Sequence, residues 1–395
     1  MGETTAAAGP SERIHSVDVV RGLVMVLMAI DHVRVYAGVP AWSAEPAIFF
    51  TRWVTHFCAP VFVFLAGNSA FLAGRRLGPD ALGRRLLVRG ALLILLELTL
   101  VRVAWTFNFD FGRYLLAGVL WMLGWCMILM APLVRLPLRL VAAFGALMIA
   151  GHNLSALLSE ATVRALLAGP LGWLLRILYF GGGITVGGSA TPNFLVLYSL
   201  VPWIGVMAVG YAFGAVLVFE RRSRDRTCLA IGLASVALFL VLRAFNLYGD
   251  WPWAASAQMP GWLAFLNTTK YPASLLFLLM TLGPTIAALP FFERASGAPS
   301  RVLAVFGRVP FAYYLLHIPL IHAVALLISL VRTPAATGWL FHDHPMRPGP
   351  APQGYMWSLW LLYGVTALVV ALLYFPCRAF AAQKARRAHA WLSYL

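Results

Sequence analysis

Residues 356–377 read MWSLWLLYGVTALVVALLYFPC, an apolar run without a single charged side chain. An α-helix rises about 1.5 Å per residue, so a run of this length covers the roughly 30 Å hydrocarbon core of a bilayer. A buried helix of a soluble domain is usually shorter and carries a polar face. The segment therefore predicts a membrane-spanning helix.

Comparable runs recur along the whole chain. The sequence is 61% apolar and only 11% charged, whereas a soluble domain carries about 25% charged residues. Alternation typical of strands is absent, which leaves helices as the spanning structure. We expect an all-α polytopic membrane protein, a bundle of about ten transmembrane helices. They are placed at 17–38, 47–74, 85–106, 115–134, 138–158, 194–219, 227–247, 271–292, 303–331 and 356–377.

The arginines predict the orientation of these spans. With ten spans, all arginine clusters fall on one face, which the positive-inside rule assigns to the cytoplasm together with both termini. An eleventh span at 163–180 would break this alternation and is rejected. The clusters are Arg75, Arg76, Arg84 and Arg85; Arg135 and Arg139; Arg221, Arg222, Arg224 and Arg226; Arg294 and Arg301; and Lys384, Arg386 and Arg387.

The domain organisation follows from these spans. We expect a disordered cytoplasmic N-terminus over residues 1–12, a single transmembrane domain over 13–380 and a cytoplasmic tail over 381–395. The first residues lack the apolar core of a signal peptide, so none is expected to be removed. The predicted location is a bacterial inner membrane, with the lipid bilayer as partner; a homo-oligomer is compatible with this organisation.

Several other function classes are disfavoured. The net charge of +16 lies in short clusters between apolar runs, which is not the continuous basic face of a nucleic-acid binder. The four cysteines show no metal spacing. His342-Asp343-His344 lacks further ligands, and the glycine-rich run at 181–188 has no strand before it and no lysine after it. We therefore expect neither nucleic acid, metal nor a nucleotide loop.

Ionisable residues inside spans indicate a site, because they are costly there. Asp18 and Arg21 lie three apart in the first span, and Arg21 shares a helical stripe with His32, about 16 Å deeper. Asp31, next to His32, points about 100° away. Glu97 in the third span is either a counter-ion, for example of Arg102, or part of the site.

Polar residues from four elements converge on the predicted outer half of the membrane. Histidine is the natural group for proton transfer near neutral pH, and each histidine here could alternatively bond a neighbouring helix. The members of this outer cluster are Asp31, His32, His56, Asn108, Asp110 and His322. Arg52 lies one turn from His56, Trp105 lies on the stripe that extends outward from Glu97, and Tyr314 and His317 lie on one face of the ninth span.

Three segments resemble a known family. Arg13-Ile-His-Ser-Val-Asp-Val-Val-Arg-Gly22 followed by Asp31-His32, the stretch from Thr55 to Gly67, and the stretch from Gly307 through His317 to His322 are similar to the heparan-α-glucosaminide N-acetyltransferase catalytic-domain family. The last stretch is also similar to the wider group of multi-span acyltransferases that modify surface glycans.

The resemblance implies transfer of an acetyl group from cytoplasmic acetyl-CoA to an acceptor sugar across the membrane. Asp18, Arg21 and Gly22 match the opening motif, and Pro60 aligns with a proline of the family's second span. His32 falls where the lysosomal enzyme has an asparagine. That enzyme's proposed catalytic histidine lies in the first outer loop, and 41–50 contains none here, so His56 or His32 must supply the base.

These expectations combine into one mechanistic hypothesis. Acetyl-CoA or another acyl-CoA binds from the cytoplasm, and its acyl group passes to a glycan or small-molecule acceptor on the other side, directly or through an acyl-histidine. The competing function is a proton-coupled transporter with a histidine relay. The candidate catalytic residues are His56, His32 and Asp31. The candidate substrate-binding residues are Arg52, Trp105, Asn108, Asp110, Tyr314, His317 and His322. The candidate cofactor-binding residues are Asp18, Arg21, Arg84, Arg85 and Arg89.

Overall fold

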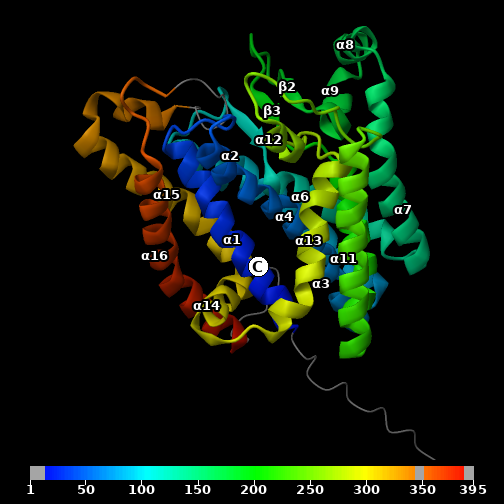
Figure 1. Ribbon diagram of the computed structural model, residues 1–395. Coiled ribbons are helices and arrows are strands. Elements are labelled where there is room, and N and C mark those ends of the chain that lie inside the picture. The colour runs from blue at the N-terminus through cyan, green and yellow to red at the C-terminus, as the bar shows by residue number, and fades with distance from the viewer. Residues whose placement is uncertain (1–13, 343–350, 387–395) are drawn as a thin grey trace, which may run out of the picture.

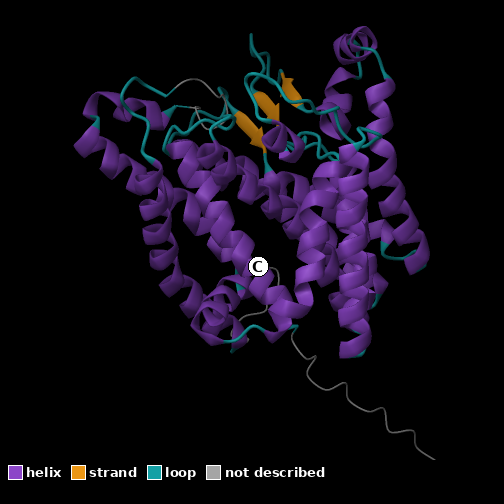
Figure 2. Ribbon diagram, viewed as in Figure 1, coloured by secondary structure: helices purple, strands orange, loops and turns teal. Residues whose placement is uncertain are grey.

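The computed structural model describes residues 14–342 and 351–386, and nearly all of their regular structure is helical (Figure 2). Six helical segments are long and apolar enough to cross a membrane, and two shorter helices are also apolar. The chain is thus a multi-pass membrane protein whose regular structure is almost entirely helical. The six segments are Pro46–Leu77, Leu138–Leu157, Arg221–Ala244, Leu275–Arg294, Pro310–Arg332 and Leu359–Ala385; the shorter helices are Val119–Leu133 and Val201–Leu217.

The first three predicted spans form long helical segments with local irregularities. Helix α1 covers His15–Tyr36 and ends just before Gly38, whose φ of 68° favours glycine. The second segment contains a 3₁₀ turn and the third a π-helical turn, a feature often found at functional sites. These segments are α2 (Pro46–Trp53), η1 (Val54–Phe57) and α3 (Cys58–Leu77), then α4 (Pro79–Leu96), η2 (Glu97–Val101) and α5 (Arg102–Thr106).

A small three-stranded sheet, which the sequence did not predict, lies between helices. β3 (Phe194–Val196) is the central strand, parallel to β1 (Leu115–Ala117) and antiparallel to β2 (Gly182–Ile184). Leu115 pairs with Phe194, and Gly182 pairs with Val196. Two predicted spans, 115–134 and 194–219, therefore begin as strands, and their helices are the shorter α6 (Val119–Leu133) and α10 (Val201–Leu217).

The remaining long helices overlap predicted spans, and six of the ten predicted spans coincide with helices that are long and apolar enough to cross a membrane. The segment at 163–180 forms short helices that are too short to span, as expected. The predicted span 303–331 is wrong at its start, because the chain breaks at Val309, where Pro310 disfavours a helical conformation of the preceding residue. The elements are α7 (Leu138–Gly151), η3 (His152–Leu157), α8 (Glu160–Ala168), α9 (Gly172–Leu175), η4 (Arg176–Phe180), α11 (Arg221–Ala244), α12 (Gly261–Leu266), α13 (Leu275–Arg294), α14 (Gly297–Arg308), α15 (Pro310–Arg332), η5 (Pro334–Phe341) and α16 (Leu359–Ala385).

Helix α1 lies in the middle of the bundle and contacts α3, α13, α14, α15 and α16. Its approach to α14 depends on two glycines. A Cβ atom at Gly22 would collide with the backbone of Leu303, and one at Gly307 would collide with the backbone of Asp18. The sheet, α2 and α12 lie at one end of the bundle, called the sheet end below, and α14 lies at the opposite end, the α14 end (Figure 1).

Candidate functional site

A cavity of about 450 Å³ opens near the α14 end and is lined by α1, α3, α4, α6 and α15. Its wall carries six cationic side chains and, among the described residues, no aspartate or glutamate. The wall between these cations and the middle of the bundle is apolar, with Met25, Leu86 and Leu123 among its residues. We call it the arginine cavity; its cations are Arg21, Arg76, Arg85, Arg89, Arg308 and Lys384.

A second cavity, of about 350 Å³, lies toward the sheet end and is lined by Asp31 and His32 of α1. Trp105, Tyr198 and Tyr314 contribute aromatic walls. We call it the histidine cavity. A space of about 30 Å³ beside it is again lined by Asp31 and His32, so the far end of α1 faces open volume on more than one side.

The two cavities meet within the bundle. Val119 and Tyr314 line both of them, and Val119 also lines the small space beside His32. Because α1 is helical from His15 to Tyr36, Arg21 and His32 are separated by about 16 Å along its axis. A cation-rich cavity therefore adjoins a cavity that contains a histidine, with Val119 and Tyr314 in the wall that they share.

His32 is held by a second histidine from α15. Its Nδ1 lies 2.6 Å from Nε2 of His317, and Nδ1 of His317 lies 2.6 Å from the carbonyl oxygen of Tyr314. A carbonyl only accepts, so Nδ1 of His317 is assigned the proton and its Nε2 accepts from Nδ1 of His32. This assignment leaves Nε2 of His32 with its lone pair free, the state that a general base requires.

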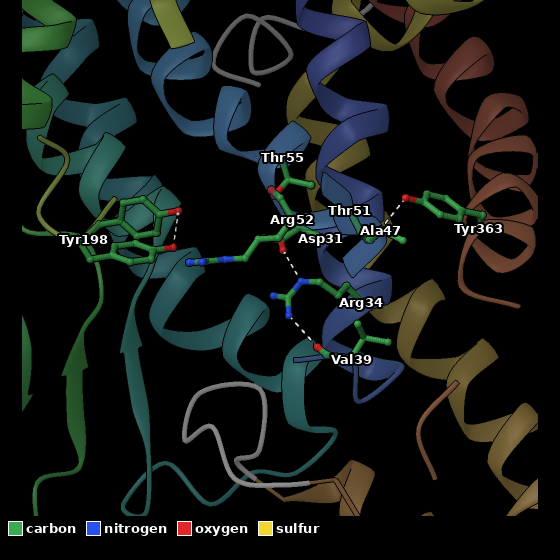
Figure 3. A network of polar contacts seen from close by, with 10 residues as sticks. Asp31, Arg34, Val39, Ala47, Thr51, Arg52, Thr55, Tyr198 and Tyr363 are labelled. Carbon is green, nitrogen blue, oxygen red and sulfur yellow. Dashed lines mark hydrogen bonds and ion pairs between the residues drawn. The ribbon is translucent and has the colours of Figure 1, made fainter. Parts of the chain in front are cut away.

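Charged neighbours fix the sheet end of α1. The Asp31 carboxylate accepts from Nε of Arg34 at 3.0 Å, and Arg34 also donates to the Val39 carbonyl at 2.9 Å (Figure 3). From α2, Arg52 extends its guanidinium toward Tyr198 (Figure 3), and both residues line the histidine cavity. Asp31 is thus held by Arg34 and does not contact His32 as an orienting partner.

Glu97 lies at the start of the π-helical turn η2 and lines the histidine cavity. Its Oε2 accepts from the backbone nitrogen of Leu120 at 3.1 Å, and its Oε1 lies against Gly118, where a Cβ atom would not fit. The carboxylate therefore satisfies the first turn of α6, next to the point where the two cavities meet.

Several predicted site residues lie elsewhere. His56 is buried against Phe277; both of its ring nitrogens lack a hydrogen-bond partner in the described part of the chain, and it lines neither cavity. His322 stacks on Phe107 with ring centres 3.8 Å apart and bonds the Ala104 carbonyl. Neither histidine is brought to the cavity walls, whereas His317 acts on the histidine cavity through His32.

Asn108 and Asp110 belong to a network around the buried Arg102. The Asn108 side chain accepts from Arg102 at 2.6 Å and donates to the Phe341 carbonyl at 2.7 Å. The Asp110 carbonyl also accepts from Arg102, while its carboxylate caps the backbone of Arg113. Both predicted substrate-binding residues therefore anchor the loop that follows α5, and they line neither cavity.

Of the predicted cofactor-binding residues, likewise, some line a cavity and others do not. Arg21, Arg85 and Arg89 line the arginine cavity, whereas Arg84 is exposed and does not line it. Asp18 lies 3.8 Å from Arg21 and is buried behind it. Asp18 thus positions Arg21, which also donates to the Ser69 hydroxyl of α3 at 2.9 Å and to the Gly307 carbonyl of α14 at 3.3 Å.

Sequence reasoning missed several cavity residues. Lys270 is a single positive charge between two predicted spans, which gave no signal of a site, yet it is 8% exposed and lines the histidine cavity. Arg308 and Lys384 come from elements distant in sequence, and only folding brings them to the arginine cavity. The metal triplet considered at His342 falls largely outside the described residues, and within these residues no group of three candidate ligands gathers.

The fold and these cavities define a class, a helical membrane protein with a polar cavity inside its bundle and a cation-rich cavity beside it. Residues 13–248, more than half of the chain, match the family model described as heparan-alpha-glucosaminide N-acetyltransferase, catalytic. The chain therefore belongs to this family of membrane acyltransferases, as the sequence motifs predicted. No curated protein matches it.

Proposed function

We propose that the protein transfers an acyl group, acetyl in the first instance, from acyl-CoA to an acceptor across the membrane. The observation that carries this proposal is the meeting of the two cavities at Val119 and Tyr314. The phosphates of CoA would bind the cations of the arginine cavity, since arginine matches phosphate geometry well. The extended pantetheine arm would follow the apolar wall and present the thioester beside His32.

His32 is the proposed general base. Its Nε2 takes the proton from an acceptor hydroxyl or amine as that oxygen or nitrogen attacks the thioester carbonyl carbon. The new ester or amide bond forms, the carbon–sulfur bond breaks, and the CoA thiolate leaves and receives a proton from the His32 imidazolium. Hydrogen-bond donors such as the Trp105 indole would stabilise the developing oxyanion. His56, the other candidate base, lies off the cavity wall.

The sidedness of the reaction is part of the proposal. Ten spans with both termini in the cytoplasm would place the α14 end and its arginines on the cytoplasmic side, where acyl-CoA is available. The sheet end would then face the outside of a bacterial inner membrane, and the acceptor would be a glycan or a small molecule there. Reporter fusions at residue 395 and in the loop at 252–258 should report opposite sides of the membrane.

The experiment uses purified protein in lipid nanodiscs and acetyl-CoA labelled in its acetyl group. Saturable binding should be weakened about tenfold by Arg85→Gln, because a charge-assisted contact is lost. Arg84→Gln is the matched control, since Arg84 is exposed and off the wall. Thioester turnover should be lost in His32→Asn and retained in His56→Asn.

Each result separates the proposal from a competing function. Wild-type protein that is folded but binds neither acetyl-CoA nor a longer acyl-CoA would overturn it and favour the proton-coupled transporter. Equal loss of turnover in His32→Asn and His56→Asn would remove His32 as the specific base. Label that stays on the protein after denaturation would identify an acyl-histidine intermediate.

A further inference from the structure

Two cations of the histidine cavity have no ion-pair partner among the described residues. Lys270 is nine-tenths buried, and it makes no ion pair or hydrogen bond through its ammonium group to any residue of the described chain; the ring of Tyr271 lies 5.3 Å from it. The Arg52 guanidinium likewise has no ion-pair or hydrogen-bond partner within residues 14–342 and 351–386. Both side chains line the same cavity.

The other charges around this cavity are already engaged. Asp31 is paired with Arg34 at 3.0 Å, and Glu97 accepts from the backbone of Leu120. Three cations thus face two carboxylates on the cavity wall. An uncompensated charge away from water is unfavourable unless a partner neutralises it. Among the described residues, the cavity wall therefore carries more cations than carboxylates, and neither carboxylate is hydrogen-bonded to Lys270 or Arg52.

The position of Lys270 is fixed by the fold. It lies in the segment between α12 and α13, and the Asp250 carboxylate holds that segment from its other side. Asp250 accepts from the Thr269 backbone at 2.9 Å, from the Thr269 hydroxyl at 2.6 Å and from the Ser274 hydroxyl at 2.8 Å. Thr269 and Ser274 line a separate cavity, so Lys270 is directed to the histidine cavity by a rigid support.

We propose that Lys270 and Arg52 form an anion-binding subsite of the histidine cavity, which selects an acceptor that carries a carboxylate or a phosphate group. The inference rests on the proposed transfer reaction and deepens it. The anionic group would bind between the two side chains, with its nucleophilic hydroxyl or amine directed to His32. Lys270 and His32 also line the small space beside the cavity, which places the subsite next to the proposed base.

Direct binding measurements on the full-length protein in nanodiscs test the subsite without requiring turnover. The probes are D-glucuronate for the carboxylate, α-D-glucose 1-phosphate for the phosphate and uncharged D-glucose. At least one anion should bind more tightly than glucose, with an affinity that falls as salt is raised. Lys270→Gln and Arg52→Gln should each weaken that binding about tenfold or more, whereas Lys270→Arg should retain most of it.

The control is Arg222→Gln, which removes an exposed cation that lines neither cavity and should leave anion binding unchanged. Binding of both anions no tighter than that of glucose, or binding that survives both Lys270→Gln and Arg52→Gln, would overturn the subsite. Acetyl-CoA binding is measured on the same samples. If acetyl-CoA fails to bind while Lys270-dependent anion binding persists, the proposed transfer fails and the subsite stands; the reverse result removes the subsite alone.

Discussion

The buried cations of this chain differ in what satisfies them. Arg243 in α11 is 2% exposed and donates to four backbone carbonyls, those of Trp251, Ala264, Phe265 and Asn267, at 2.9 to 3.0 Å. Such an arginine needs no ligand, because its guanidinium is surrounded by acceptors. Lys270 has no such acceptors among the residues that the structure describes. The number of protein acceptors thus distinguishes a structural cation from one available to a substrate.

Replacing Arg243 should destabilise the protein without affecting either cavity directly. Arg243→Leu would leave four carbonyls of the α12 region without their donor, a loss on the order of 3 kcal/mol. We expect the melting temperature in detergent to fall by about 5 °C or more. Arg222→Leu, at an exposed position near the start of the same helix, is the control. Equal melting temperatures for the two variants would show that the carbonyl contacts contribute nothing.

Replacing His317 should lower turnover by releasing His32. His317→Leu removes the acceptor of the 2.6 Å contact, so His32 would lose its fixed ring orientation and tautomer. We expect a loss of about tenfold or more in kcat, with acetyl-CoA binding unchanged. His317→Gln, which offers an acceptor oxygen, should recover part of it. In both variants and in wild type, activity should fall on acidification, because a protonated His32 is not a base.

The comparison of His317→Leu with His317→Gln also tests whether His317 has a purely structural role. If His317→Leu and His317→Gln lose the same amount of activity, or if acetyl-CoA binding falls together with kcat, His317 supports the bundle and does not orient the base. The shape of the pH profile is a second readout. Loss of the His32–His317 contact should shift its acidic limb, which a general loss of folded protein would not do.

At the scale of elements, the central contact is that between α1 and α14. The two glycines that permit it lie on opposite helices, Gly22 against Leu303 and Gly307 against Asp18. This contact holds Arg21 and Arg308 on the same cavity wall. The break at Val309 then redirects the chain into α15, which carries Tyr314 and His317. The arginine cavity and the His32–His317 pair both depend on this corner.

Substituting either glycine should separate the helices. Gly22→Ala and Gly307→Ala each place a Cβ atom where backbone atoms of the other helix lie, and overpacking of this kind costs about 1–3 kcal/mol. We expect lower melting temperatures and weaker acetyl-CoA binding in both variants. Gly364→Ala in α16 is the control, because a Cβ atom there meets nothing within 4 Å. A stability loss in Gly364→Ala equal to that of the other two would contradict the packing argument.

Features carried by one element could be predicted from the sequence. The stripe from Arg21 to His32 requires only a continuous helix, and the structure supplies one. His56 shows where this reasoning fails. It lies in the 3₁₀ turn η1, which advances about 120° per residue where an α-helix advances about 100°. Four such residues rotate the helix face by roughly 80° relative to a regular helix, so the face of His56 could not be read from α-helical spacing.

Features that join distant elements could not be predicted from one sequence. His32 and His317 are 285 residues apart, and nothing in local periodicity pairs them. Lys270 lies in a loop whose course is set by Asp250, which is itself distant in sequence. The short sheet could not be predicted for a different reason, because strands of three residues are too short to show an alternating pattern. The motifs that identify the family, in contrast, are contiguous in the sequence, so they can be recognised without knowledge of the fold.

At the scale of the whole molecule, the proposed reaction requires a passage between two chemically different cavities. The arginine cavity offers cations for phosphates, the histidine cavity offers a base, and the acyl group must cross where they meet. Val119 and Tyr314 form that meeting point. Because Val119 is partly exposed to the open volume and begins helix α6, a larger side chain there can occupy the passage without removing a buried contact.

The variant Val119→Trp should therefore uncouple binding from transfer. Acetyl-CoA should still bind the cations of the arginine cavity with little change, and D-glucuronate or α-D-glucose 1-phosphate should still bind near Lys270. Turnover should fall by about a hundredfold or more, since the thioester no longer reaches His32. Val119→Ala, which widens the passage, is the control and should keep transfer while accepting longer acyl chains. Wild-type turnover in Val119→Trp would mean that acyl groups do not pass between these cavities.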